Sequence, residues 1–368
     1  MAERAQCIAL LKMVSETCNA ALQSISDRSL SSDKVDLPPL AIIHKDFTSL
    51  LSLIYSSTTK LALVMNPSSP TYPATVTPLN DLSKHISAVS YCSKLVDPNE
   101  HGATISQEIA DVASSVTDAL NSLVKTFLET EALGEHAGSG DYMVKTGSVH
   151  DLIEAARSSN GLSKDNLSAV RKKWTEDTEP LEDGTRELKE LIESAGDEGF
   201  GDEDDGWDEL GLGGTEPLSS EEAERASKIH LILRLVALLH KKVASDLLVR
   251  STDVLTPSHS SLDELPALSR AILSASDEVI AALHPPQDQP VLKHELDAYR
   301  QVLQDLKKCV YQFLPEEAVE DQIERLTFKN GSGSRGKKTS KRRWFDSCFE
   351  QIFKGLDNGS SVLSDSEA

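Results

Sequence analysis

Cysteines and aromatic residues are scarce in this chain of 368 residues. The five cysteines are spread along the sequence without a CxxC pair, and aromatic residues make up 5% of it. Scattered cysteines indicate reduced thiols in a core, because a disulfide framework or a zinc site needs cysteines at paired spacings. The sequence therefore predicts an intracellular protein without disulfide bonds.

Targeting segments and long hydrophobic runs are also missing. The first residues, MAERAQCIALLKMVSE, contain a short apolar segment without a small-residue cleavage site. The most apolar stretch, Ile229 to Leu239, is interrupted by His230 and Arg234. Because a membrane span needs about 18–20 apolar residues, we predict neither a secretion signal nor a transmembrane segment.

Motifs of common enzyme chemistry do not occur. The sequence contains no GxxxxGK[ST], no GxGxxG after a strand, no GxSxG and no HExxH. His230 and His240 lie on one apolar stretch, where a hydrogen-bonded core histidine is commoner than a metal ligand. Distant residues can still meet in a helical fold, so an unrecognised enzyme remains an alternative. We predict a non-catalytic protein with no metal and no cofactor.

The charge balance is strongly acidic. The chain has 59 Asp and Glu against 37 Lys and Arg, a formal net charge of −22. Phosphate contacts require Lys and Arg, so direct nucleic-acid binding is disfavoured. The balance favours protein partners, in particular basic ones.

Apolar residues recur at helical spacing through most of the chain. One stripe runs from Cys7 to Ile25 in steps of three and four, and another runs from Ile105 to Phe127. No segment shows the clean alternation of a strand. We predict an all-α protein of two antiparallel helical bundles, residues 1–195 and 219–328.

One helix is apolar on more than one face. It begins at Ser219, which forms a capping-box pattern with Glu222. One face carries Ile229, Ile232, Val236, Leu239 and Val243, and another carries Leu231, Leu235 and Leu238. Apolar residues on several faces indicate a central helix that is buried all round.

A Gly-rich acidic segment, residues 196–218, separates the two predicted bundles. Eight of the thirteen residues 197–209 are acidic, which predicts a disordered linker. It is either a solvated hinge or a recognition motif in which an aromatic anchor enters a basic-rimmed pocket on a partner. The candidate contact residues are Phe200, Asp202, Glu203, Asp204, Asp205, Trp207, Asp208 and Glu209.

The last segment, residues 329–368, has a basic stretch and then an amphipathic pattern, and we expect it to be mostly disordered. Lys337, Lys338, Lys341, Arg342 and Arg343 are candidates for nuclear localisation or for an anionic surface. Trp344, Phe345, Phe349, Ile352 and Phe353 follow at helical spacing. This helix could bind a lipid surface, a calmodulin-like groove or its own bundle.

Two further hypotheses concern the same segment. Its basic residues could pair with the acidic linker in cis. Ser364, with Glu367 three residues later, fits the pattern of an acidophilic kinase substrate and is a candidate phosphorylation site.

Three stretches resemble the cyclin-D-binding, GCIP-like protein family. KTGSVHDLIEAARSSNGLSKDNLSAVRKKW, from Lys145 to Trp174, resembles a late helix pair of the family's N-terminal domain. SASDEVIAALHPPQ, from Ser274 to Gln287, resembles its C-terminal segment, in which a helix ends at a double proline. The acidic residues 197–209 correspond to the insert between them.

This resemblance implies a non-catalytic, two-bundle helical protein. It implies binding of D-type cyclins or helix-loop-helix regulators, negative regulation of cell-cycle progression or transcription, and location in cytoplasm and nucleus. The basic tail has no counterpart in the family pattern. An adaptor that binds membranes or calmodulin through its tail helix is the alternative.

Overall fold

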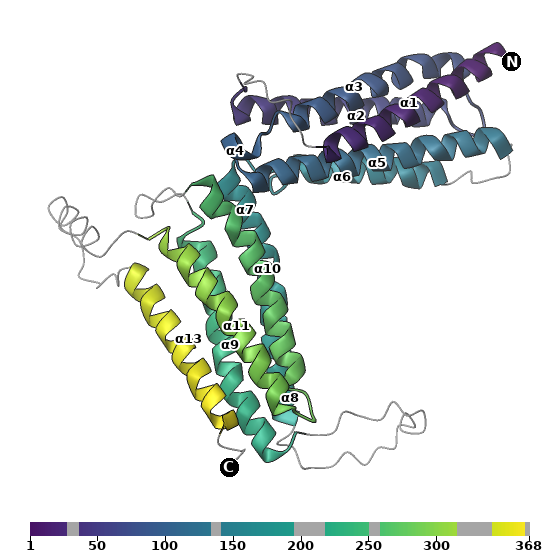
Figure 1. Ribbon diagram of the computed structural model, residues 1–368. Helices are drawn as coiled ribbons and strands as arrows, with labels where there is room; N and C mark the ends of the chain where they lie inside the picture. The colour runs from purple at the N-terminus through teal and green to yellow at the C-terminus, as the bar shows by residue number, and fades with distance from the viewer. Residues whose placement is uncertain (28–36, 134–140, 195–217, 250–257, 315–340, 365–368) are drawn as a thin grey trace, which may run out of the picture. The chain divides into compact units, whose positions relative to one another are not determined.

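The structure, a computed structural model, shows an all-helical chain. It describes residues 1–27, 37–133, 141–194, 218–249, 258–314 and 341–364. Within these ranges all regular secondary structure is helical, which confirms the predicted class. The helices form two compact units, Met1–Ala169 and Val170–Ala368 (Figure 1).

The first unit is a bundle of long helices around one core. Its elements are α1 (Ala2–Ser26), α2 (Leu40–Val64), η1 (Tyr72–Thr75), α3 (Val76–Lys94), α4 (Pro98–His101), α5 (Ala103–Leu133) and α6 (Asp141–Arg157). Helix α1 packs on α3 and α5, α2 packs on α3 and α6, and α5 packs on α6.

Most of the apolar stripe of α1 is buried within this bundle. Cys7, Leu11 and Val14 are fully buried, as their spacing predicts, whereas Leu22 is half-buried and its neighbour Ala21 is buried. A single stripe on this helix therefore meets the two helices that flank it.

Helix α2 is long and apolar enough, by length and composition alone, to cross a membrane. Core helices of soluble proteins pass the same test, so this is weak support for a span. Ile42, Leu53 and Leu63 of this helix are exposed. Its large apolar residues Ile43, Phe47, Leu51 and Ile54, in contrast, are buried within the first unit. Core packing therefore accounts for their apolar character.

The cysteines are free and buried, as predicted from their scattered positions. Burial raises the pKa of Cys18 to about 12, and burial likewise raises the pKa of Cys309 to about 12. These thiols stay protonated near neutral pH and act as small core residues.

The second unit contains the remaining helices. They are α7 (Asn166–Glu176), α8 (Thr178–Ser194), α9 (Ser220–Asp246), α10 (His259–Ala282), α11 (Gln289–Tyr311) and α13 (Lys341–Ser364). Helix α8 packs on α9 and α10, α10 packs on α11, and α13 packs on α9 and α11. The capping box of Ser219 and Glu222 is present at the start of α9, as predicted.

The division between the two units falls at Ala169, inside α7, and not at residue 195 where the acidic segment suggested it. The physical reason is a buried contact. The Trp174 ring stacks on the His240 ring with centroids 4.3 Å apart, and Trp174 Nε1–H donates to the carbonyl oxygen of His240 at 2.9 Å. This contact joins α7 to α9, and α8 also packs on α9, so α8 and α7 from Val170 onward belong to the second unit.

A buried hydrogen-bond chain continues from this contact. Ser269 Oγ–H donates a hydrogen bond to Asp177 Oδ2 at 2.7 Å. Because the hydroxyl proton of Ser269 is used in this bond, Ser269 Oγ accepts the hydrogen bond from His240 Nε2–H at 2.9 Å. His240 Nδ1 then accepts from Thr178 Oγ1 at 3.3 Å. Arg270 pairs with the other Asp177 oxygen at 3.1 Å. The chain satisfies each buried polar group that it joins, as a packed interior requires.

Candidate functional site

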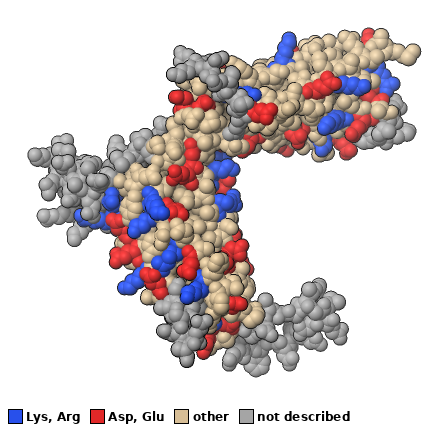
Figure 2. Space-filling model, in the orientation of Figure 1, with Lys and Arg blue, Asp and Glu red and all other residues tan. Residues whose placement is uncertain are grey.

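The residues predicted for the acidic recognition motif, from Phe200 to Glu209, lie outside the described residues. Lys337 and Lys338 also lie outside them. Residues 195–217 contain nine Asp and Glu and no Lys or Arg. On the described surface, Figure 2 shows acidic and basic side chains mixed over the visible faces. The motif therefore remains a prediction.

The amphipathic residues of the tail lie on the second unit, in helix α13. Phe345, Phe349 and Ile352 are fully buried, and Trp344 and Phe353 are half-buried. Of the alternatives open for this segment, the structure shows docking on its own helices. Residues 341–364 are thus an ordered helix, unlike the mostly disordered tail that was expected.

The basic residues at the start of α13 also make contacts within the second unit. Lys341 Nζ donates to the carbonyl oxygen of Asp246 at 3.3 Å, and the Arg342 guanidinium carbon lies 5.1 Å from the centroid of the Tyr311 ring. Arg343 is exposed. Ser364 is the last residue of the helix, and its side chain is outside the described residues.

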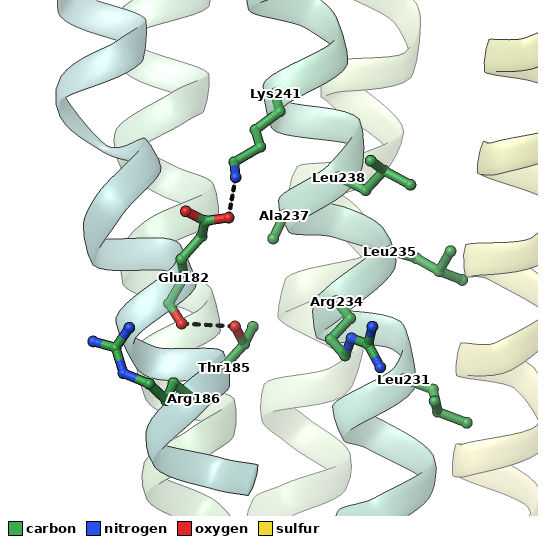
Figure 3. A pocket seen from close by; sticks show the side chains of 9 residues that line it. All are labelled: Glu182, Thr185, Arg186, Leu231, Arg234, Leu235, Ala237, Leu238 and Lys241. Atoms are coloured by element: carbon green, nitrogen blue, oxygen red, sulfur yellow. Dashed lines mark hydrogen bonds and ion pairs between the residues drawn. The ribbon is translucent and has the colours of Figure 1, made fainter.

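A groove between α8 and α9 is the best candidate for a functional surface among the described residues. The groove has a volume of about 760 Å³ and is open to solvent. Figure 3 shows the side chains that line it. Its lining residues are Glu182, Thr185, Arg186, Leu231, Arg234, Leu235, Ala237, Leu238 and Lys241.

Among the lining residues on α9 is a leucine stripe made of Leu231, Leu235 and Leu238, whose side chains point away from α8 in Figure 3. Leu231 is 59% exposed, Leu238 is 50% exposed, and Leu235 between them is partly exposed. Their spacing of four and three places all three on one side of the helix, as Figure 3 shows. The prediction that α9 is buried on every apolar face is therefore wrong for this face.

The charged groups around the leucine stripe are mainly basic. Arg186 on α8 and Arg234 and Lys241 on α9 line the groove, with Glu182 as the one carboxylate in the lining set. Lys241 and Glu182 form an ion pair across the groove, which links α8 to α9 (Figure 3). Arg186 pairs with Asp183 on α8, so two of these three cations already have a carboxylate partner. The apolar stripe is therefore the main feature that the groove offers to an amphipathic partner.

The buried Asp177, His240 and Ser269 are the residue types of a hydrolytic triad, but their arrangement is structural. Ser269 donates to the carboxylate of Asp177 and all three are 3% exposed or less, so a substrate cannot reach them. Burial lowers the pKa of His240 to about 4, which makes it a poor base at neutral pH. In the described part of the chain, no group of three or more His, Cys, Asp and Glu could hold a metal.

Comparison with protein families identifies the class of protein that these features fit, a helical interaction protein. The family model described as Grap2 and cyclin-D-interacting, N-terminal, matches residues 46–194, and the C-terminal model of the same description matches residues 203–308. The chain belongs to this family. A comparison with curated proteins finds no match.

The two family segments do not coincide with the two structural units. The N-terminal match includes α7 and α8, which pack in the second unit with helices of the C-terminal match. One wall of the groove therefore comes from each segment. Helix α13 lies beyond both matches.

Sequence reasoning missed the leucine stripe as a surface feature. The signal was present, because α9 carries two apolar faces. The periodicity of the sequence does not show how many neighbouring helices are available to cover these two faces.

Proposed function

We propose that this protein is a non-catalytic regulator that binds a cyclin-like or helix-loop-helix protein through the groove between α8 and α9. The family description supports a protein-interaction role. The observation that carries the choice of surface is the leucine stripe, with Leu231 and Leu238 at least half exposed. Covering one such leucine completely stabilises a complex by roughly 1.5–3 kcal/mol relative to full exposure.

The finer parts of the proposal follow from the family resemblance. Binding would restrain cell-cycle progression or transcription, in cytoplasm and nucleus. The alternative, an adaptor that uses the tail helix on membranes or calmodulin, has less support, because the apolar face of α13 packs on α9 and α11.

The test is a double variant, Leu231→Ser with Leu238→Ser, measured for binding to purified D-type cyclin and to a purified helix-loop-helix protein. We expect at least a tenfold loss of affinity for the partner with an unchanged melting temperature, because both side chains are already exposed.

A matched control is available in the first unit, where Leu53 is 47% and Leu63 is 73% exposed on α2. The variant Leu53→Ser with Leu63→Ser makes the same chemical change and should bind normally. Equal affinity of the groove variant and the wild type for both partners would contradict the proposal.

A further inference from the structure

Helix α13 lies along α9 and α11 and runs antiparallel to both. Its first residue, Lys341, contacts Asp246 near the end of α9, while Gly355 lies against Ile232 earlier in α9. Figure 1 shows α13 beside these two helices in the second unit.

The contact is mainly hydrophobic. Phe345, Phe349, Ile352 and Leu356 recur at spacings of four, three and four, and each is 1% exposed or less. Lys307 of α11 lies 5.9 Å from the centroid of the Phe349 ring. This is the way an amphipathic helix fills a groove on a binding protein.

One position on α13 permits unusually close packing. A Cβ atom added at Gly355 would lie 3.0 Å from Cγ1 and 3.3 Å from Cδ1 of Ile232. Glycine at this point therefore lets the two helices approach closely, and a larger side chain would force Ile232 to shift. A Cβ added at Gly359, one turn later, would meet nothing within 4 Å.

Two polar contacts of α13 lie at the margins of its apolar face. Arg300 pairs with Asp357 at 2.5 Å, and the Tyr311 hydroxyl donates to Asp346. Asp357 is exposed, and ion pairs in contact with water contribute only about 0–1 kcal/mol each. A helix with the same apolar pattern could therefore replace α13 without copying these pairs.

The matched family segments end at residue 308, whereas α13 begins at residue 341. Helix α9 and most of α11, which form the surface beneath α13, thus lie inside the matched segments, and α13 lies outside them. We propose that this face of α9 and α11 is a second protein-binding surface, beyond the leucine groove, which α13 occupies as an internal competitor. The partner is an amphipathic helix that carries four large apolar residues separated by four, three and four positions. A small residue precedes the fourth apolar residue, as Gly355 precedes Leu356 in α13.

The test uses the full chain with Gly355→Leu, and Gly359→Leu as its matched control. Both variants make the same substitution on the same helix, but only the first meets Ile232. The probe is a fluorescein-labelled peptide of residues 341–359, and binding is followed by fluorescence anisotropy. A scrambled peptide of the same composition controls for attraction by charge.

We expect the peptide to bind the Gly355→Leu chain at least tenfold more tightly than the wild type or the Gly359→Leu chain. A second variant, Phe349→Asp, removes α13 by a different route and should give the same gain. Equal binding of the peptide to all four chains would overturn the proposal.

Two other results would also overturn it. If both undocking variants abolish the thermal transition of the second unit, α13 is an integral core helix and not a competitor. The other is dimerisation of the wild type by exchange of α13, which light scattering would detect as a mass that rises with protein concentration. The occupant would then be a second copy of the chain and not a foreign helix.

Discussion

Helix α1 of the first unit and helix α9 of the second are nearly equal in length, 25 and 27 residues, but they use their apolar residues differently. The single stripe of α1 is covered by α3 and α5. Helix α9 has two apolar faces, and α8 and α13 leave Leu231 and Leu238 exposed. Exposed leucines alone do not mark a binding surface, since Leu53 and Leu63 of α2 are exposed too; on α9 they lie together along a groove bordered by α8.

The largest effect should come from the contact that assigns α7 to the second unit. Trp174→Ala removes a fully buried indole and its hydrogen bond to His240, which should cost about 3–5 kcal/mol of unfolding free energy. Urea unfolding of the full chain measures it. The exposed neighbour Lys173→Ala should change little, and an equally small loss for Trp174→Ala would contradict the position of the boundary.

A direct comparison of the two helices comes next. Leu11→Ala on α1 should cost about 2–5 kcal/mol, because it leaves a cavity in a closed core. Leu231→Ala on α9 should stay within about 0.5 kcal/mol, because its side chain already contacts water. Similar losses in urea unfolding for the two variants would remove the distinction between the helices.

A smaller effect should follow acidification, through His240. Burial lowers its pKa from 6.5 to about 4 in the folded chain, so the unfolded chain binds more protons between these values. Stability due to this group is therefore full above pH 6.5 and falls as the pH drops towards 4. By pH 5 the loss is about 2 kcal/mol, at 1.36 kcal/mol per pKa unit.

The control for this effect is His240→Gln, which cannot take up the proton. Its urea-unfolding free energy should depend less on pH between 7.5 and 5 than that of the wild type. Parallel pH profiles for the two chains would show that His240 is not buried in its neutral form.

Much of the helical pattern could be predicted from the sequence. The spacing of Cys7, Leu11 and Val14 defined the buried face of α1, because a single stripe has one way to be covered. The capping box of Ser219 and Glu222 marked the start of α9 from local chemistry alone.

The rest depends on contacts between distant residues. Trp174 and His240 are 66 positions apart, so no local pattern could assign α7 to the second unit. Whether Leu231 is a core residue or a surface residue depends on which helices lie beside α9. The docking of α13 was one of several alternatives that its amphipathic pattern fits equally well.

The central claim is that the leucine stripe on α9 contacts the partner. The most direct measurement replaces Leu238 with a photo-cross-linking residue and, in a second chain, replaces Leu63 of the first unit in the same way. After irradiation with purified D-type cyclin or helix-loop-helix partner, the account predicts a covalent product from position 238 and none from position 63. A product from position 63 alone would contradict it.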